Sequence, residues 1–367
     1  MSALEYVLSI RHILDITARP GKAVITSHRA SQGYLMRIGL VGVGRIGVFH
    51  ASTLRALPGV DSLVLTDADL GRAREVARQT GAQAAESVAE LLGAGIDALV
   101  IAATTGAHPE LIKRGVQAGV PVFCEKPVAP DVEGTLDVIE ATGGSAVPVQ
   151  IGFQRRFDEG FRAARAAARS GSLGWLHTIR STTFDAAPPP AGYIRGSGGI
   201  FRDCAVHDFD AVRWVSGREV VQVYATGANR GEDFFRAAGD VDTACAALRM
   251  DDGTLAMVNC GRYNGAGYDV RLEVLGSAGS VCAGLDDRMA LRPAGPGSFP
   301  AGPAHRDFMG RFGDAYVAEL AAFIGVAAGQ AASPCTLQDA LEAFYVAEAC
   351  ELSRHRQQPV LVAEVRQ

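Results

Sequence analysis

The sequence lacks the features of a disulfide-rich, membrane or nucleic-acid-binding protein. Its seven cysteines are scattered, at positions 124, 204, 245, 260, 282, 335 and 350, and no two have the C-x-x-C spacing. Neither a disulfide framework nor a metal site is therefore expected. No apolar run reaches the roughly 18 residues that a membrane span needs. The net charge is −5, without a long basic run, which argues against nucleic acid or a membrane as partner. We expect a globular protein of the reducing cytoplasm.

The first 35 residues contain no strand pattern. Glu5 and Asp15 interrupt their apolar residues, so they hold no signal-peptide core. The first strand pattern begins at Met36, which is itself a candidate start codon. Residues 1–35 are thus an extension of doubtful status: a mis-assigned start or an expression leftover, which we favour, or a real extension with a packing role.

From residue 36 onward, short apolar runs alternate with segments of helical spacing. Strands are expected at 37–43, 61–66, 97–103, 120–125 and 147–153, and helices at 46–57, 70–80, 108–118 and 132–142. This alternation is typical of a doubly wound parallel sheet with helices on its faces. We assign residues 36–157 to this first domain.

The period of the pattern changes in the second half of the chain. After a helix at 159–168, runs of period two occur at 176–184, 220–226, 243–250, 254–262, 270–275 and 280–283. A Gly/Pro-rich loop at 293–303, helices at 316–328 and 337–354, and a short strand at 359–362 complete the chain. These runs predict an α+β domain over residues 158–367, with a large and mostly antiparallel open sheet.

The motif Gly42-Val43-Gly44-Arg45-Ile46-Gly47 follows a predicted strand and opens a predicted helix. Glycines at this spacing permit a tight turn and close approach of the backbone to a pyrophosphate, which then lies at the helix N-terminus. Asp67 stands at the end of the second strand, where a carboxylate accepts hydrogen bonds from ribose hydroxyls and repels a 2′-phosphate. The motif therefore predicts a dinucleotide site that favours NAD, although the nearby Arg72 leaves NADP open.

Further polar residues follow the later strands of the first domain. Glu125-Lys126-Pro127 lies at the carboxyl end of a buried strand, the edge where ligands bind in such sheets. Lys126 either points its ammonium into this cleft or is a solvated loop lysine. Thr104 and His108 follow the preceding strand and are candidate cofactor contacts, although His108 serves equally well as a helix start. Gln154-Arg155-Arg156 at the domain junction binds a polyol or the cofactor, or forms an interdomain ion-pair cluster.

The segment 198–214 carries the most informative pattern. Read as a helix, it places Asp203, His207, Asp210 and Trp214 on one stripe bracketed by apolar residues, with only Asp208 and Arg213 exposed. The i, i+4 spacing lets Asp203 orient His207 and stabilise its protonated form, as a proton-transfer pair requires. The alternative is a buried polar network without a catalytic role.

Together these motifs resemble the glucose–fructose oxidoreductase / inositol dehydrogenase (Gfo/Idh/MocA) family over residues 36–362, and most closely its inositol 2-dehydrogenase branch. The resemblance implies a Rossmann domain followed by the α+β domain. It implies that Lys126, Asp203 and His207 are the catalytic set, and that Glu125 belongs to the cofactor site. Asp210 and Arg155 would bind hydroxyls of a cyclic polyol or sugar, and Tyr268 would face the substrate. It also implies subunit pairing through the second sheet, giving a dimer or tetramer.

The expected chemistry is oxidation of a secondary alcohol by hydride transfer to NAD. His207, oriented by Asp203, takes the hydroxyl proton, and Lys126 stabilises the negative charge that develops on the oxygen. Two other functions stay open: a non-catalytic NAD-binding sensor, and an NAD-dependent glycosidase. Gln154 and the surroundings of Tyr268 depart from the pattern of inositol dehydrogenases, so the particular polyol is left open.

Overall fold

The computed structural model describes residues 35–366, and the expected extension lies outside them apart from Leu35. The first sheet has six parallel strands in the order β3-β2-β1-β4-β5-β6. These strands are β1 (Met36–Val41), β2 (Val60–Thr66), β3 (Gln83–Ala84), β4 (Ala98–Ile101), β5 (Val122–Glu125) and β6 (Val149–Gly152). Successive strands are added on one side of β1 up to β3 and on its other side from β4 onward, which confirms the doubly wound topology. In such sheets the ligand crevice lies at the carboxyl ends of the strands on either side of this switch point, here β1 and β4.

The helices of this region begin at capping side chains that the sequence supplies. The carboxylates of Asp69 and Asp131 accept hydrogen bonds from the main-chain N–H groups of Arg72 and Gly134, which satisfies first-turn donors that lack helical partners. Ser87 caps a short helix that the sequence analysis omits. The helices are α2 (Arg45–Ala56), α3 (Leu70–Thr80), α4 (Val88–Gly93), α5 (His108–Gln117) and α6 (Val132–Thr142).

The second sheet has seven strands in the order β12-β11-β7-β10-β9-β8-β13. They are β7 (Leu176–Phe184), β8 (Val220–Ala228), β9 (Thr243–Met250), β10 (Leu255–Gly261), β11 (Asp269–Gly276), β12 (Ser280–Ala283) and β13 (Val360–Leu361). All neighbours are antiparallel except β7 and β10, which run parallel with Phe184 opposite Gly261. The expected mostly antiparallel sheet is thus confirmed, with one parallel pair at its centre.

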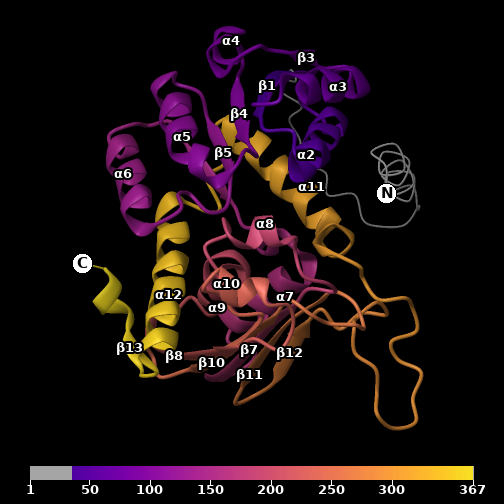
Figure 1. The fold of residues 1–367 in the computed structure, drawn as a ribbon, viewed down its shortest axis with the longest axis vertical. Helices are drawn as coiled ribbons and strands as arrows, with labels where there is room; N and C mark the ends of the chain where they lie inside the picture. Colours follow the sequence, from indigo (N-terminus) through magenta and orange to yellow (C-terminus); the bar gives the residue numbers. More distant parts are fainter. Residues whose placement is uncertain (1–34, 367) are drawn as a thin grey trace. The chain divides into compact units, whose positions relative to one another are not determined.

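Two long C-terminal helices cover the first sheet, and one of them, α12, also packs against the second sheet. Leu320 and Phe323 of α11 (Phe308–Ala327) lie in the apolar core that covers one face of the first sheet, together with side chains of β1, β2 and α3. Ala340 and Ala343 of α12 (Leu337–Arg356) lie in the core on the other face. Figure 1 shows α12 extending from the first sheet to the second. The first sheet's core is therefore completed by residues far beyond 157, the boundary that the sequence predicts for this domain.

Four further helices belong to the second half of the chain, and Asp203 and His207 lie just before and at the start of one of them. They are α7 (Glu159–Arg169), the short helix α8 (Ala191–Ile194), α9 (Val206–Ser216) and α10 (Phe234–Ala237). A π-helical turn, η4 (Phe201–Ala205), leads directly into α9. Short 3₁₀ turns occur at η2 (Thr105–Ala107), η3 (Gln154–Phe157) and η5 (Val362–Val365). No helix within residues 35–366 is long and apolar enough to cross a membrane.

Candidate active site

The glycine motif forms the turn between β1 and α2. Gly42 has φ of 93°, and a Cβ there would lie 2.5 Å from the main-chain nitrogen of Ala103. A Cβ on Gly47 would collide with the carbonyl oxygen of Gly42, whereas one on Gly44 would meet no atom within 4 Å. The first and third glycines are thus required by the protein's own packing, and the second borders open space. This is the arrangement that lets a pyrophosphate approach the backbone.

Asp67 is tied to the glycine motif through its carboxylate. The main-chain N–H of Val43 donates to its Oδ2 at 2.7 Å, and that of Asp69 donates to its Oδ1 at 2.8 Å. The half-exposed guanidinium of Arg72 donates to the same Oδ1 at 2.7 Å. Burial raises the pKa of Asp67, but these N–H donors and the charge of Arg72 together lower it below its usual value. An ionised carboxylate and a cation therefore lie together beside the glycine motif.

Lys126 joins the two halves of the structure. It follows β5 at the carboxyl edge of the first sheet, and its Nζ donates to the main-chain oxygen of Asp203 at 2.7 Å and to Oδ1 of Asp203 at 3.2 Å. Both side chains are mostly buried. Of the two alternatives left open by the sequence, the structure favours the ammonium directed into the crevice.

The carboxylate of Asp203 lies in a cluster of hydrogen-bond donors. The Tyr193 hydroxyl donates to Oδ1 at 2.8 Å, and the Arg262 guanidinium donates to Oδ2 at 2.8 Å. Burial alone would raise the pKa of Asp203, but the charges of Lys126 and Arg262, with the hydrogen bonds from Arg262 and Tyr193, lower it well below its usual value. Asp203 is therefore a carboxylate at any pH near neutrality.

His207 lies one helical turn after Asp203, but the two side chains are not hydrogen-bonded to each other. Nδ1 of His207 is buried and hydrogen bonds to no group within residues 35–366, and the ring packs edge-on against Phe153 at 5.7 Å between centroids. Burial lowers the pKa of His207 well below its usual value, and the charges of Lys126 and Arg155 act in the same direction, against that of Asp203. The expected orienting hydrogen bond from Asp203 to His207 is therefore not formed; the charge of Asp203 does favour the protonated imidazole, as expected, but burial and the two cations outweigh it.

Of the other members of the predicted helical stripe, Trp214 is half-buried beneath the guanidinium of Arg165, and Asp210 is buried in an ion pair. Asp210 is fully buried, and Arg156 donates to its two carboxylate oxygens at 2.5 and 2.9 Å. Asp208 and Arg213, which the sequence analysis expects to be exposed, are also buried. The π-helical turn before α9 shifts the angular positions, because a helix with i→i+5 hydrogen bonds turns less per residue than an α-helix.

Arg155 lies beneath the crevice rather than in it. Its side chain is 2% exposed, and it donates to Asp208 at 2.8 Å and to the Thr183 hydroxyl at 2.8 Å. The charges of Arg155 and Asp210 are therefore already paired within the protein, whereas the resemblance implies that they bind substrate hydroxyls. The structure favours the alternative of an ion-pair cluster between the two halves, in which unpairing either buried charge would be costly.

Three further predicted cofactor residues follow strands of the first sheet. Thr104 is exposed at the carboxyl end of β4. His108 is buried, and its two ring nitrogens lie 2.7 Å from the carbonyl oxygen of Pro127 and 3.1 Å from that of Ala103. His108 thus ties the loop after β4 to the Lys126 segment. Glu125 is largely buried, and its Oε1 lies 2.6 Å from Nε2 of His50.

Tyr268, the predicted substrate-facing tyrosine, is 7% exposed. Burial raises its pKa; the positive charge of Arg155 opposes this shift and the negative charge of Asp185 adds to it. The sequence analysis omits three members of the cluster around Asp203: Tyr193, Asp185 and Arg262. Arg262 donates to Asp185 at 3.1 Å as well as to Asp203. Their signal in the sequence is the position of Asp185 and Arg262 one residue beyond the ends of β7 and β10.

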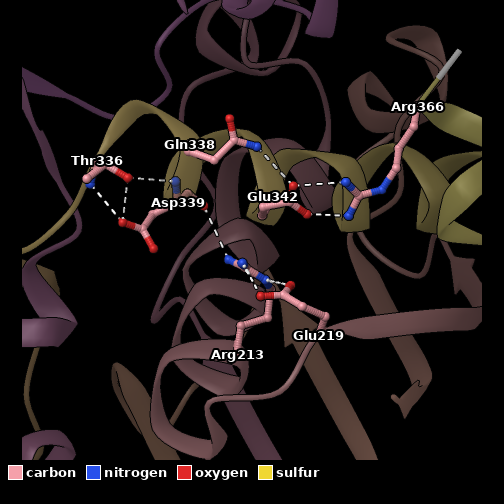
Figure 2. A pocket seen from close by; sticks show the side chains of 7 residues that line it. All are labelled: Arg213, Glu219, Thr336, Gln338, Asp339, Glu342 and Arg366. Atoms are coloured by element: carbon pink, nitrogen blue, oxygen red, sulfur yellow. Dashed lines mark hydrogen bonds and ion pairs between the residues drawn. The ribbon is translucent and has the colours of Figure 1, made fainter.

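In a separate polar pocket on the surface, the charged side chains that line the pocket are paired with one another. Figure 2 shows Arg213 paired with Glu219, and Arg366 paired with Glu342, between α9 and the first turns of α12. None of its lining residues belongs to the predicted site. This pocket therefore does not bear on the predicted site at the carboxyl edge of the first sheet.

Comparison with known proteins agrees with this geometry. Residues 36–153 match the model of the oxidoreductase family with an NAD-binding Rossmann fold, and residues 161–282 match that of the GFO/IDH/MocA C-terminal domain. The chain is 42% identical to myo-inositol dehydrogenase Hyg17 of Streptomyces leeuwenhoekii, over 87% of this chain and 97% of that protein.

Solved structures show the same arrangement. A myo-inositol dehydrogenase from Corynebacterium glutamicum superposes with a TM-score of 0.82 at 37% identity, covering 89% of this chain and 98% of that one. The scyllo-inositol dehydrogenase of Lactobacillus casei, with bound NAD(H) and scyllo-inositol, superposes with a TM-score of 0.80 at 28% identity, covering 90% and 99%. The chain is a member of the GFO/IDH/MocA oxidoreductase family, with an NAD-binding Rossmann domain.

Proposed function

We propose that this protein oxidises a secondary alcohol of a cyclic polyol of the inositol class, with NAD as the hydride acceptor. The observation that carries the proposal is the pair of hydrogen bonds that fixes Lys126 to Asp203, one helical turn before His207, whose pKa is lowered well below its usual value. Relatives that cover nearly the whole chain are inositol dehydrogenases by name, which supports the substrate class.

The residues fit the cofactor that the family binds. The open space beside Gly44 admits a pyrophosphate, and Asp67 provides an ionised carboxylate for the ribose hydroxyls. NAD, when bound, accepts the hydride that leaves the alcohol carbon. Arg45 lies exposed at the start of α2, where a cation and a helix N-terminus both favour phosphate.

The proton chemistry belongs to the protein. His207, whose pKa is lowered by burial and by the charges of Lys126 and Arg155, accepts the hydroxyl proton as a general base. Lys126 has one N–H left after its two hydrogen bonds to Asp203, and that N–H donates to the substrate oxygen and stabilises its developing charge. Asp203 holds the lysine in place; it is a positioning residue for Lys126.

The test is a panel of cyclitols and aldoses offered with NAD or NADP, followed by absorbance of the reduced cofactor. A polyol dehydrogenase forms one reduced cofactor for each alcohol oxidised. A sensor would bind NAD without turnover, and a glycosidase would recycle the cofactor without net reduction. Net reduction with free inositol, slowed by about 10²-fold or more in the variant Lys126→Ala, is the expected result.

We further propose that the outer face of the second sheet pairs two subunits. Exposed apolar side chains alternate along this face, which is unusual for a surface in contact with water; they include Tyr224 of β8 and Leu255 and Met257 of β10. Sedimentation of the wild type and of Met257→Glu tests this, because a charge at the centre of such a face should dissociate the dimer or tetramer. We expect the protein to act in the reducing cytoplasm.

A further inference from the structure

Tyr193 occupies an unusual position between the surface and the predicted catalytic residues. It belongs to α8, the short helix after Pro188-Pro189-Pro190, and the residue is 49% exposed. Its hydroxyl nevertheless donates to Oδ1 of Asp203 at 2.8 Å. The tyrosine therefore lies along the wall of the crevice, with its ring partly in solvent and its hydroxyl beside the cluster.

The hydroxyl of Tyr193 and the ammonium of Lys126 share one acceptor. Nζ of Lys126 lies 3.2 Å from the same Oδ1 that Tyr193 contacts. Two groups bound to one oxygen stand next to each other, as do the hydroxyls on neighbouring carbons of a cyclic polyol. A substrate whose reacting oxygen contacts Lys126 thus brings an adjacent hydroxyl toward Tyr193.

The hydrogen-bonding polarity of Tyr193 is determined by Asp203. A phenol has one proton to donate and lone pairs that accept. Because Asp203 is ionised it can only accept, so the Tyr193 proton is committed to it. Burial, followed by the negative charge of Asp203, raises the pKa of Tyr193 well above its usual value, so the phenol keeps that proton. Toward a substrate, Tyr193 can therefore only accept a hydrogen bond.

We infer that Tyr193 is a specificity residue that accepts a hydrogen bond from the substrate hydroxyl next to the one being oxidised. This inference rests on the proposed oxidation of a cyclic polyol. The three polar groups then have distinct tasks: Lys126 donates to the reacting oxygen, His207 accepts its proton, and Tyr193 accepts from the neighbouring hydroxyl. A hydrogen atom or a methoxy group in place of that hydroxyl offers no donor to Tyr193.

For each neighbouring carbon, the experiment compares three substrates with two enzymes. The substrates are the best cyclitol of the panel and its analogues with hydrogen or methoxy in place of the hydroxyl on each neighbouring carbon in turn. The enzymes are the wild type and Tyr193→Phe, which keeps the ring. We expect the wild type to prefer the intact cyclitol over both analogues at one neighbouring position by roughly tenfold or more in kcat/KM, because unpaired polar groups penalise analogues. In Tyr193→Phe this preference should shrink to about threefold or less, since a lost hydrogen bond is worth roughly tenfold.

Tyr263→Phe is the matched control, because it removes the hydroxyl of another partly exposed tyrosine, one that accepts from the main-chain N–H of Glu232 and does not contact Asp203. It should keep the wild-type preference. An equal loss of kcat/KM for all three substrates in Tyr193→Phe would mean that the residue acts only through Asp203, and would overturn the inference. An unchanged preference would overturn it too. A wild type that reduces no NAD with any polyol would instead refute the proposed function itself, and this inference with it.

Discussion

Lys126 donates two hydrogen bonds to a single residue, Asp203: one to its main-chain oxygen at 2.7 Å and one to its carboxylate at 3.2 Å. The lysine follows a strand of the first sheet, and the aspartate lies in the turn that leads into α9. The contact therefore fixes the ammonium relative to both halves of the structure. Because two hydrogen bonds join the ammonium to this one residue, Lys126 and Asp203 should behave as one unit in kinetics.

A double-mutant cycle on Lys126→Ala and Asp203→Asn should reveal this unit. Lys126→Ala should still bind NAD, since the glycine motif is untouched, while kcat falls by about 10²-fold or more, as for other lost contacts to a charged oxygen. Asp203→Asn should lose part of the same effect. The double variant should then be little worse than Lys126→Ala alone, because groups that act together are not additive.

A second double-mutant cycle, on Asp203→Asn and His207→Ala, tests whether Asp203 also acts through His207. No hydrogen bond joins Asp203 to His207, so the losses of Asp203→Asn and His207→Ala should be closer to additive than those of the first cycle. Thermal melts of each variant check that the folded fraction is unchanged. Additive losses for Lys126 and Asp203, or normal turnover per folded molecule in both single variants, would remove the pair from the catalytic set.

The pH dependence of turnover should report a histidine with a lowered pKa. His207 accepts a proton only when it is neutral, so kcat/KM should fall as the pH drops through its pKa and stay level above it. Burial and the charges of Lys126 and Arg155 lower that pKa well below 6.5, so the acidic limb should lie below pH 6.5. The limb should vanish in His207→Ala. An acidic limb with its midpoint at or above pH 6.5 would contradict the assigned environment.

Cofactor choice should depend on the pair of Asp67 and Arg72. The wild type should prefer NAD, because the ionised Asp67 repels a 2′-phosphate. Asp67→Ala should reduce the ratio of kcat/KM for NAD to kcat/KM for NADP by roughly tenfold, since charge contacts near a surface are worth about one to a few kcal/mol. It should also raise KM for NAD, because the N–H of Val43 loses its acceptor. Arg72→Leu should lower kcat/KM for NADP below that of the wild type. Higher kcat/KM for NADP than for NAD in the wild type would show that Arg72 dominates.

Most elements of the fold follow from patterns in the sequence. The helices predicted at 70–80 and 132–142 and the strands predicted at 176–184, 243–250 and 280–283 have the bounds found in the structure, because capping residues, glycine turns and period-two runs define their ends. The short helices α4, α8 and α10 escaped prediction, since four to six residues are too few to show helical periodicity.

The site was harder to predict, for two physical reasons. The stripe of Asp203 and His207 assumed a uniform α-helix, and the π-helical turn at 201–205 rotates the later residues. The cluster around Asp203 also depends on strand order: β7 and β10 run parallel, which brings the residues after them, Asp185 and Arg262, side by side. A sequence that predicts an antiparallel sheet places these two residues at opposite edges.

Glu319 on α11 should make the stability of the protein depend on pH. It is fully buried, and neither carboxylate oxygen hydrogen bonds to a group within residues 35–366. Burial, with the charges of Glu125 and Asp210, raises its pKa well above its ordinary value of 4.5. In the unfolded chain the group ionises near that ordinary value, so the unfolded state binds fewer protons above it. The free energy of unfolding must therefore fall as the pH rises from 4.5 toward the folded pKa.

Glu319→Gln removes this ionisation while keeping the shape of the side chain. Relative to the wild type, the variant should become more stable as the pH rises, by up to about 1.4 kcal/mol for each pH unit between the two pKa values. Denaturant unfolding at several pH values from 4.5 to 8 measures the difference. Glu140→Gln, at an exposed position of α6, is the matched control and should show no such trend. A difference between Glu319→Gln and the wild type that does not grow with pH would mean that Glu319 is ionised in the folded protein, and a buried carboxylate without a partner would then need a cation beside it.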